Sequence, residues 1–203
     1  MKLAAVVAFS LCAMPVLAHQ PGDARQTADD LIHSPINEIK PPPGVQILFS
    51  PQHNIEAAVV RAMALAKREI LFSQYALTNP RIAEALANAR RRGVVVQGIL
   101  EPFPAIENYV TPRVMAQMSI PILYPKERGW NNHKFTVIDR ETVITGSFDW
   151  TRSANDNADN CLVVTEASFA AAYYNAWVAQ ARRSATFGAT FDDETPQKPR
   201  ISR

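Results

Sequence analysis

The chain has 203 residues, of which 47% are hydrophobic and 20% are charged, a composition typical of one globular domain with a buried core. Its 21 lysine and arginine residues nearly balance its 19 aspartate and glutamate residues, which gives a formal net charge of +2. This balance argues against a protein that binds DNA nonspecifically through a large basic excess.

The chain opens with a stretch typical of an export signal. Lys2 precedes an apolar run at 3–13, which is well short of the roughly 20 residues that a membrane-spanning helix needs. We expect residues 1–18 to be a signal peptide that is cleaved between Ala18 and His19. The mature protein is therefore predicted to be periplasmic or secreted, with no stable membrane insertion.

Only two cysteines occur in the chain, Cys12 and Cys161. Cleavage of the signal would remove Cys12 together with Lys2. It would leave a net charge of about +1 and a single thiol at Cys161. No internal disulfide is therefore predicted in the exported domain.

The first half of the predicted domain alternates strands with helices. Residues 19–44 are polar, end in three prolines and a glycine, and are predicted to be a linker ahead of a domain at 45–184. We expect strands at 45–49, 70–76 and 94–100, and helices at 55–66 and 80–92. Asn79 is the predicted cap of the second helix and Pro80 its first residue. This alternation predicts a largely parallel sheet with helices packed on its faces.

The second half of the predicted domain contains mostly strands, with fewer helices between them. After a proline-containing loop at 101–109 we expect a short helix at 112–118 and strands at 120–124, 135–138, 142–145 and 161–164, then a helix at 169–182. The strands at 135–138 and 142–145 are predicted to form a hairpin. Residues 185–203 are predicted to be a disordered tail. We find no internal repeat, so the chain carries one copy of any motif.

The most informative stretch lies between residues 131 and 160. It reads Asn131-Asn132-His133-Lys134, then Asp139, then Gly146-Ser147-Phe148-Asp149-Trp150, and finally Asp159-Asn160. Side chains alternate between the two faces of a strand, so Lys134 is predicted to share a face with Asn132 while His133 points away. The ammonium of Lys134 and the hydroxyl of Ser147 are groups that stabilise an anion such as a phosphate.

This order and spacing resemble the signature of the phospholipase D superfamily: His-x-Lys, four residues and Asp, then Gly-Ser-x-x-Trp or Phe and an acidic residue followed by Asn. The resemblance continues upstream in Phe49-Ser50-Pro51, Ser73-Gln74-Tyr75-Ala76 and Arg91-Arg92-Gly93-Val94, and covers roughly residues 45–182. It is greatest to the small, single-motif bacterial members of the nuclease type. It implies an α/β fold with a mostly parallel mixed sheet flanked by helices on both faces.

The resemblance also implies a role for each site residue. Asn132 stands where the family has its catalytic histidine, Asp139 matches an aspartate that is usually structural, and Asp159 matches the acidic partner of the histidine. Asp149 replaces the asparagine of many relatives. The implied catalytic positions are Asn132, Lys134, Asp139, Ser147 and Asp159, and the implied substrate contacts are Lys134, Ser147, Asp149 and Asn160. No metal or other cofactor is implied.

In the family, a histidine attacks phosphorus to form a phosphohistidine, and a second histidine protonates the leaving oxygen. A chain with one motif pairs with a copy of itself, so the resemblance implies a homodimer with a composite active site. Asn132 in both protomers would remove the nucleophile and the general acid together. A carboxamide nitrogen is delocalised and does not titrate near neutrality, so it can perform neither role.

Two functions therefore remain open. One is a phosphodiesterase, most like an exported nonspecific endonuclease, with nucleic acid or alternatively phospholipid as the substrate. The other is a catalytically silent module that binds phosphate or nucleic acid on the same scaffold. Loss of the nucleophile costs about 10⁶ in rate in a well-studied hydrolase, so we expect no efficient turnover, whether Asn132 is natural or engineered. We expect His53 and His133 to lie outside the site, and Trp130 to be a packing residue.

Overall fold

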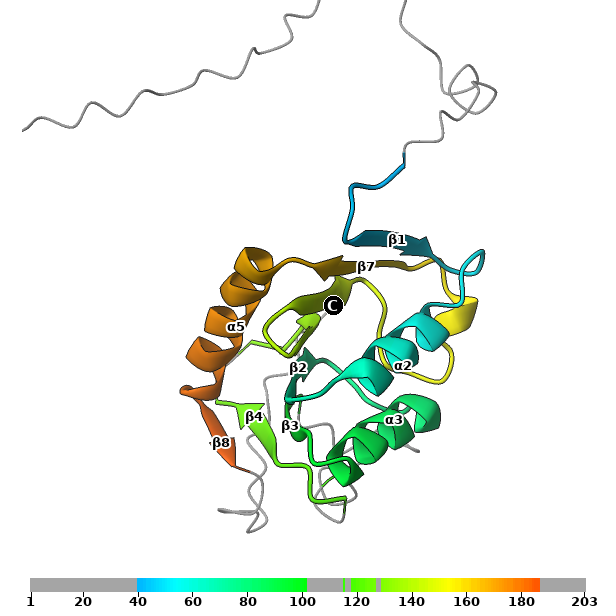
Figure 1. Ribbon diagram of the computed structural model, residues 1–203. Helices are drawn as coiled ribbons and strands as arrows, with labels where there is room; N and C mark the ends of the chain where they lie inside the picture. The colour runs from blue at the N-terminus through cyan, green and yellow to red at the C-terminus, as the bar shows by residue number, and fades with distance from the viewer. Residues whose placement is uncertain (1–39, 102–114, 116–117, 127–128, 187–203) are drawn as a thin grey trace, which may run out of the picture. The chain divides into compact units, whose positions relative to one another are not determined.

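The computed structural model describes residues 40–101, 115, 118–126 and 129–186 (Figure 1). The expected signal peptide, all but the end of the expected linker, and most of the helix expected at 112–118 lie outside the described residues. The expected tail lies outside them after residue 186.

The described residues form eight strands that belong to one sheet. The strands are β1 (Val45–Phe49), β2 (Glu69–Gln74), β3 (Val95–Leu100), β4 (Ile122–Pro125), β5 (Lys134–Ile138), β6 (Thr142–Gly146), β7 (Asn160–Thr165) and β8 (Ser184–Thr186). The helices are α2 (Ile55–Leu65), α3 (Pro80–Arg91) and α5 (Ala167–Ala181), with a short 3-10 turn, η1 (Ala154–Asp156). The strands and helices that the sequence predicts in these ranges are confirmed, with small shifts at their ends.

Helix α3 begins where the sequence predicts. The Asn79 carboxamide oxygen accepts hydrogen bonds from the N–H groups of Arg81 (2.9 Å) and Ile82 (3.2 Å), and Pro80 occupies the first helical position. Gly93, with a φ of 89°, follows the end of the helix. Within the described ranges, no helix combines the length and the apolar character needed to cross a bilayer.

The sheet is mixed, with the strand order β1-β7-β6-β5-β2-β3-β4-β8. Only the β2–β3 and β3–β4 pairs are parallel, and every other pair is antiparallel. The α/β class with a mixed sheet is confirmed, but the predicted predominance of parallel pairs is wrong. The β5–β6 hairpin lies antiparallel beside β2, and β7 and β1 continue that pattern, so parallel pairing is limited to β2, β3 and β4.

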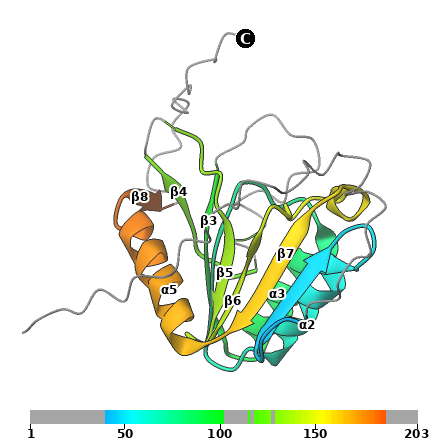
Figure 2. The same cartoon turned by 90° about the horizontal axis from the view of Figure 1, so that it is seen from above.

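Helices cover both faces of the sheet, as predicted (Figure 2). Helices α2 and α3 pack over one hydrophobic cluster that includes Phe72, and α5 packs over another that includes Leu71 and Trp177. Leu71 and Phe72 are neighbours in β2, so the alternation of the strand sends one side chain into each layer. The Trp177 indole N–H donates to the Phe72 carbonyl at 3.0 Å and ties α5 to this central strand.

Strand β8 changes the predicted C-terminal boundary of the domain. It pairs antiparallel with β4, with Ser184 opposite Pro125 and Thr186 opposite Leu123. Residues 185 and 186 therefore belong to the sheet and not to the predicted tail.

Candidate functional site

Most of the predicted site residues meet at one edge of the sheet, by which we mean the side formed by the ends of its strands and not an outermost strand. Strand β5 begins and β6 ends at this edge, and β7 begins there too, because these three neighbours are antiparallel. Asn132 precedes β5, Ser147 follows β6, and Asp159 precedes β7. The strand order β7-β6-β5 thus brings together segments that the sequence separates (Figure 2).

The ammonium of Lys134 is held by two neighbouring side chains. Its Nζ donates a hydrogen bond to Asn132 Oδ1 at 2.8 Å and lies 3.4 Å from Asp149 Oδ1, an ion-pair distance. The Tyr75 ring lies beneath it, with the ring centroid 5.8 Å from Nζ. The Lys134 side chain is only 14% exposed. The cation that would bind a phosphate therefore already has an internal carboxylate partner.

Burial raises the pKa of the Asp149 carboxyl above its ordinary value. The adjacent Lys134 ammonium lowers this pKa, while the negative charge of Asp159 raises it, and the net result is a raised pKa. The Asp149 carboxyl therefore takes up a proton more readily than an ordinary, exposed aspartate.

Ser147 is oriented by the start of β7. Its hydroxyl donates to Asp159 Oδ1 at 2.5 Å and accepts the N–H of Asn160 at 3.0 Å. Its own N–H donates to the Asn160 carbonyl at 3.1 Å. Gly146 makes this close approach possible, since its φ is 154° and a Cβ there would overlap the Asn160 carbonyl oxygen. The Ser147 proton is thus directed to Asp159.

Asp159 is fixed in turn by Ser50, a residue to which the sequence assigned no role of its own. The Asp159 N–H donates to Ser50 Oγ at 3.1 Å, and the Ser50 N–H donates to the Asp159 carbonyl at 2.9 Å. His53 follows in the same loop and lines a hollow together with Asp159 and Asn160. The Phe49-Ser50-Pro51 motif therefore serves to attach this loop to the site.

His133 points away from the site, as the strand alternation predicts. Its ring makes an edge-to-face contact with Phe135, with the centroids 5.5 Å apart. Phe135 belongs to the hydrophobic cluster beneath α5, whereas Lys134 faces Asn132 and Asp149. An imidazole at position 133 does not take the place of the missing one at position 132.

Asp139 does not join the other predicted residues, because it follows the far end of β5. Its carboxylate accepts hydrogen bonds from the N–H groups of Lys67 (2.8 Å), Arg68 (2.7 Å) and Glu69 (2.9 Å). Burial alone would raise the pKa of this carboxyl, but these backbone hydrogen bonds and the Arg68 charge outweigh it and hold the pKa below its ordinary value. Asp139 is therefore an anchor between the β5–β6 turn and the start of β2, which fits the structural aspartate that the resemblance implies, and it lies apart from the other residues of the predicted catalytic set.

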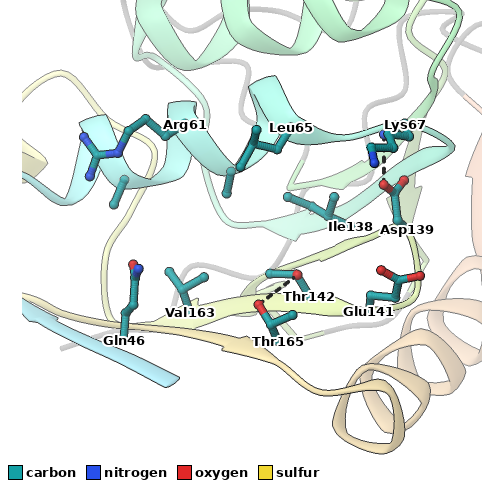
Figure 3. A pocket seen from close by; sticks show the side chains of 12 residues that line it. Gln46, Arg61, Leu65, Lys67, Ile138, Asp139, Glu141, Thr142, Val163 and Thr165 are labelled. Atoms are coloured by element: carbon teal, nitrogen blue, oxygen red, sulfur yellow. Dashed lines mark hydrogen bonds between the residues drawn. The ribbon is translucent and has the colours of Figure 1, made fainter. Parts of the chain in front are cut away.

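Asp139 also lines a pocket of about 520 Å³ between α2 and the sheet (Figure 3). Leu65, Ile138 and Val163 form its apolar middle, and Lys67 lies at one end near Asp139. Asp139 is the only predicted site residue that lines it. This pocket is distinct from the edge that carries Lys134 and Ser147.

A buried polar network lies behind the site and was not predicted from the sequence. The Asn131 N–H donates to Glu101 Oε2 at 2.7 Å, and its carboxamide donates to the Gln74 carbonyl at 3.1 Å. The Asn131 carboxamide oxygen accepts from Ser73 Oγ at 3.2 Å and Gln180 Nε2 at 3.0 Å. The only signal in the sequence is that Ser73, Gln74 and Glu101 are polar residues at the ends of apolar strands.

The groups at this edge define the chemistry that is open to it. One ammonium, one hydroxyl and one carboxamide can contact an anion, and two carboxylates lie beside them. Over the described part of the chain, no three histidine, cysteine, aspartate or glutamate side chains gather as a metal-binding group. The arrangement can bind an oxyanion, but residue 132 supplies no titrating nucleophile.

The chain matches the protein family described as cardiolipin synthase, PLD-like domain, over residues 59–182. It is 27% identical to a phospholipase D of Rickettsia bellii over 141 residues, which are 69% of this chain and 70% of the relative. It is 24% identical to the mitochondrial cardiolipin hydrolase of Canis lupus familiaris over 130 residues, which are 64% of this chain and 51% of that protein.

Two solved structures resemble the domain closely. Nuc from Salmonella typhimurium, a phospholipase D family member, superposes with a TM-score of 0.66 and 26% identity, over 70% of this chain and 97% of that one. NucT from Helicobacter pylori superposes with a TM-score of 0.63 over 70% of this chain and 98% of that one, and at 17% identity it supports the fold alone. Nearly the whole of each structure is therefore matched by this domain.

Proposed function

Because this chain belongs to the phospholipase D-like domain family, we propose that it binds phosphodiester groups at the Lys134–Ser147 edge without cleaving them through a phosphohistidine. The observation that carries this proposal is the hydrogen bond of 2.8 Å from Lys134 Nζ to Asn132 Oδ1. The residue at the position of the family's nucleophile thus contacts the cation through its oxygen. Its nitrogen is an amide nitrogen, which neither attacks phosphorus nor transfers a proton near neutral pH.

A nucleic acid is the ligand that the surroundings of Lys134 favour. Trp130 is 46% exposed, and its ring makes an edge-to-face contact with Tyr75 at 6.5 Å. Trp130 and Asn132 line one hollow of about 310 Å³ beside the site. An exposed indole close to a phosphate-binding cation can stack on a base while the cation contacts the backbone. Single-stranded nucleic acid is therefore the proposed ligand, and phospholipid is the alternative that the experiment below includes.

Hydrolysis, most like that of a nonspecific endonuclease, is the second candidate. It is supported by the retention of Lys134, Ser147 and an acidic residue at 159, and by the likeness to phospholipase D of Rickettsia bellii. It would require another group to act in place of the histidine. His53 is one candidate, because it shares a hollow with Asp159.

We further infer that two copies of the chain pair and that the protein acts in the periplasm or outside the cell. The single copy of the motif supports pairing, because a composite site needs two copies. The apolar stretch at 3–13 supports export. Light scattering on the mature domain tests the first inference, and the detection of a cleaved product in the periplasm or medium tests the second.

The main experiment compares the chain with the reversion Asn132→His. Binding is measured by fluorescence anisotropy with a labelled oligothymidylate and by co-sedimentation with vesicles of phosphatidylglycerol. Hydrolysis is measured on bis(p-nitrophenyl) phosphate and on plasmid DNA with a chelator present. We expect binding without turnover for the chain, and measurable turnover for the reversion. Turnover by the chain that the reversion does not improve would overturn the role assigned to Asn132, and a failure to bind either ligand would overturn the binding function.

A further inference from the structure

We propose that Asp149 is an internal competitor for the phosphate site: its carboxylate occupies the Lys134 ammonium and must leave or be neutralised before a phosphodiester binds. This inference rests on the proposed function, because it concerns the same site and names its regulation. It gives Asp149 the role of a specificity-determining residue, in place of the substrate contact that the sequence predicts.

The first support is that the Lys134 ammonium and the Ser147 hydroxyl already have partners within the chain. Lys134 has three N–H donors, and its ammonium contacts Asn132 at 2.8 Å, Asp149 at 3.4 Å and the face of Tyr75 at 5.8 Å. The Ser147 hydroxyl donates to Asp159 at 2.5 Å. Both donors that a phosphate would use are therefore committed to carboxylates.

The second support is the difference in exposure between the two members of the ion pair. The Lys134 side chain is 14% exposed, whereas the Asp149 side chain is 32% exposed. Only a small part of the Lys134 side chain is therefore open to a ligand while its present partners stay in place. Asp149 is the partner that carries a negative charge, and its side chain is partly open to solvent, so it is the one that a bound phosphate would displace.

The third support is the balance of charge at the site. Lys134 on β5 is the cation that faces Asp149, and Asp159 ahead of β7 is the second carboxylate nearby. The negative charge of Asp149 also acts on the Tyr75 phenol, which follows β2. Burial raises the pKa of Tyr75, and the charges of Glu101 and Asp149 raise it further. Lys134 pairs with Asp149, Asp159 adds a second negative charge beside it, and an incoming phosphodiester would add a further one. Binding is disfavoured as long as Asp149 is ionised.

This arrangement makes ligand binding depend on pH in a defined direction. Burial raises the pKa of Asp149, so this carboxyl takes up a proton at a higher pH than an ordinary aspartate does. Protonation removes the competitor, while a phosphodiester keeps its negative charge over the same range. Binding should therefore tighten as the pH falls through the raised pKa of Asp149.

The test uses Asp149→Asn, with Asp156→Asn as the matched control. Asp156 is exposed in η1, between the same two strands, and its substitution changes the net charge equally. The dissociation constant of a labelled oligothymidylate is measured by anisotropy at fixed salt, from neutral to mildly acidic pH. We expect Asp149→Asn to bind about tenfold more tightly at neutral pH, and its affinity to lose most of the acid dependence. Asp156→Asn should behave like the unmodified chain.

Further variants separate failure of this inference from failure of the proposed function. If Lys134→Ala in the Asp149→Asn background weakens binding but Asp149→Asn binds no more tightly than Asp156→Asn, the competitor role is wrong and the phosphate site stands. If Lys134→Ala has no effect, or no variant binds, both are wrong. Thermal melting checks that Asp149→Asn is folded, and Asp149→Ser replaces it in the same comparison if it is not.

Discussion

Lys134 Nζ donates a hydrogen bond of 2.8 Å to Oδ1 of Asn132, two residues earlier in the same segment. A strand places side chains i and i+2 on one face, so the contact follows from local geometry. The residue at the nucleophile position therefore helps to hold the cation in place, and the cation rather than residue 132 carries the proposed affinity for phosphate.

Substitution of Lys134 by Ala should weaken oligothymidylate binding about tenfold or more, because it removes the cation that contacts the phosphate. It should also reduce the slope of log affinity against log salt by about 0.7, as expected for one contact to a single strand. Lys67→Ala is the matched control, since Lys67 lies at the opposite edge of the sheet, next to Asp139. Equal weakening by both variants would mean that the oligonucleotide binds by general charge attraction and not at this site.

Two neighbouring asparagines should differ sharply in their effect on stability. Asn131 is 4% exposed and its carboxamide joins three hydrogen bonds, so Asn131→Ala leaves the buried Gln74 carbonyl and the Gln180 amide without this partner. We expect the free energy of unfolding to fall by about 2–4 kcal/mol. Asn132→Ala removes one exposed contact and should cost about 0.5 kcal/mol or less. Urea denaturation measures both, and similar losses for the two variants would contradict the role of the buried network.

Asp139→Ala should destabilise the fold without removing ligand binding. It deletes the acceptor of three backbone N–H groups, at Lys67, Arg68 and Glu69. The carboxylate is only partly buried and its charge is screened, so we expect a loss of about 1–2 kcal/mol at neutral pH.

The pH dependence of the Asp139→Ala effect has a defined sign. The pKa of Asp139 is lowered in the folded chain, so its contribution is complete above the unfolded pKa of about 3.9. It is lost as the pH falls through the lower, folded pKa. The difference in unfolding free energy between the two chains should therefore shrink below about pH 4. A difference that persists at lower pH would show that the charge of Asp139 is not what stabilises the turn.

Gly146→Ala should disturb both the fold and the site. A Cβ at Gly146 would overlap the Asn160 carbonyl oxygen, and the φ of 154° is strained for any residue with a side chain. We expect a loss of about 1–3 kcal/mol in unfolding free energy and weaker oligothymidylate binding, because Ser147 would be displaced. Gly129→Ala is the control, since an added Cβ there meets no atom within 4 Å. If Gly146→Ala retains full stability, the close approach of β6 to Asn160 is not a constraint on the fold.

Local signals in the sequence were sufficient to predict most elements of the fold, but not β8. The cap at Asn79 and the proline after it set the start of α3, and apolar runs set the strands. Pairing was not predictable in the same way, because an apolar run has the same pattern in a parallel and in an antiparallel sheet. Only the folded chain shows that β1 pairs with β7 and that β8 pairs with β4. These two pairs place β1 and β8 as the outermost strands of the sheet.

The candidate site likewise has a part that the sequence predicted and a part that only the structure shows. The resemblance to the phospholipase D signature predicted that Lys134, Ser147 and Asp159 belong to one site, and the structure places them at neighbouring ends of β5, β6 and β7. The same signature included Asp139, which the length of β5 carries to the opposite edge. The network behind Asn131 could not be predicted, because its members are far apart in the chain: Ser73 and Gln180 are separated by 107 positions.

The sequence by itself determined that residue 132 is an asparagine and that the chain carries one copy of the motif. Neither depends on how the chain folds. A carboxamide has no nucleophilic, titrating nitrogen in any conformation. Only the tertiary structure decided that Lys134 also contacts Asp149. Asp149 follows β6, whereas Lys134 begins β5. The two charges lie 3.4 Å apart because antiparallel pairing places the start of β5 beside the end of β6.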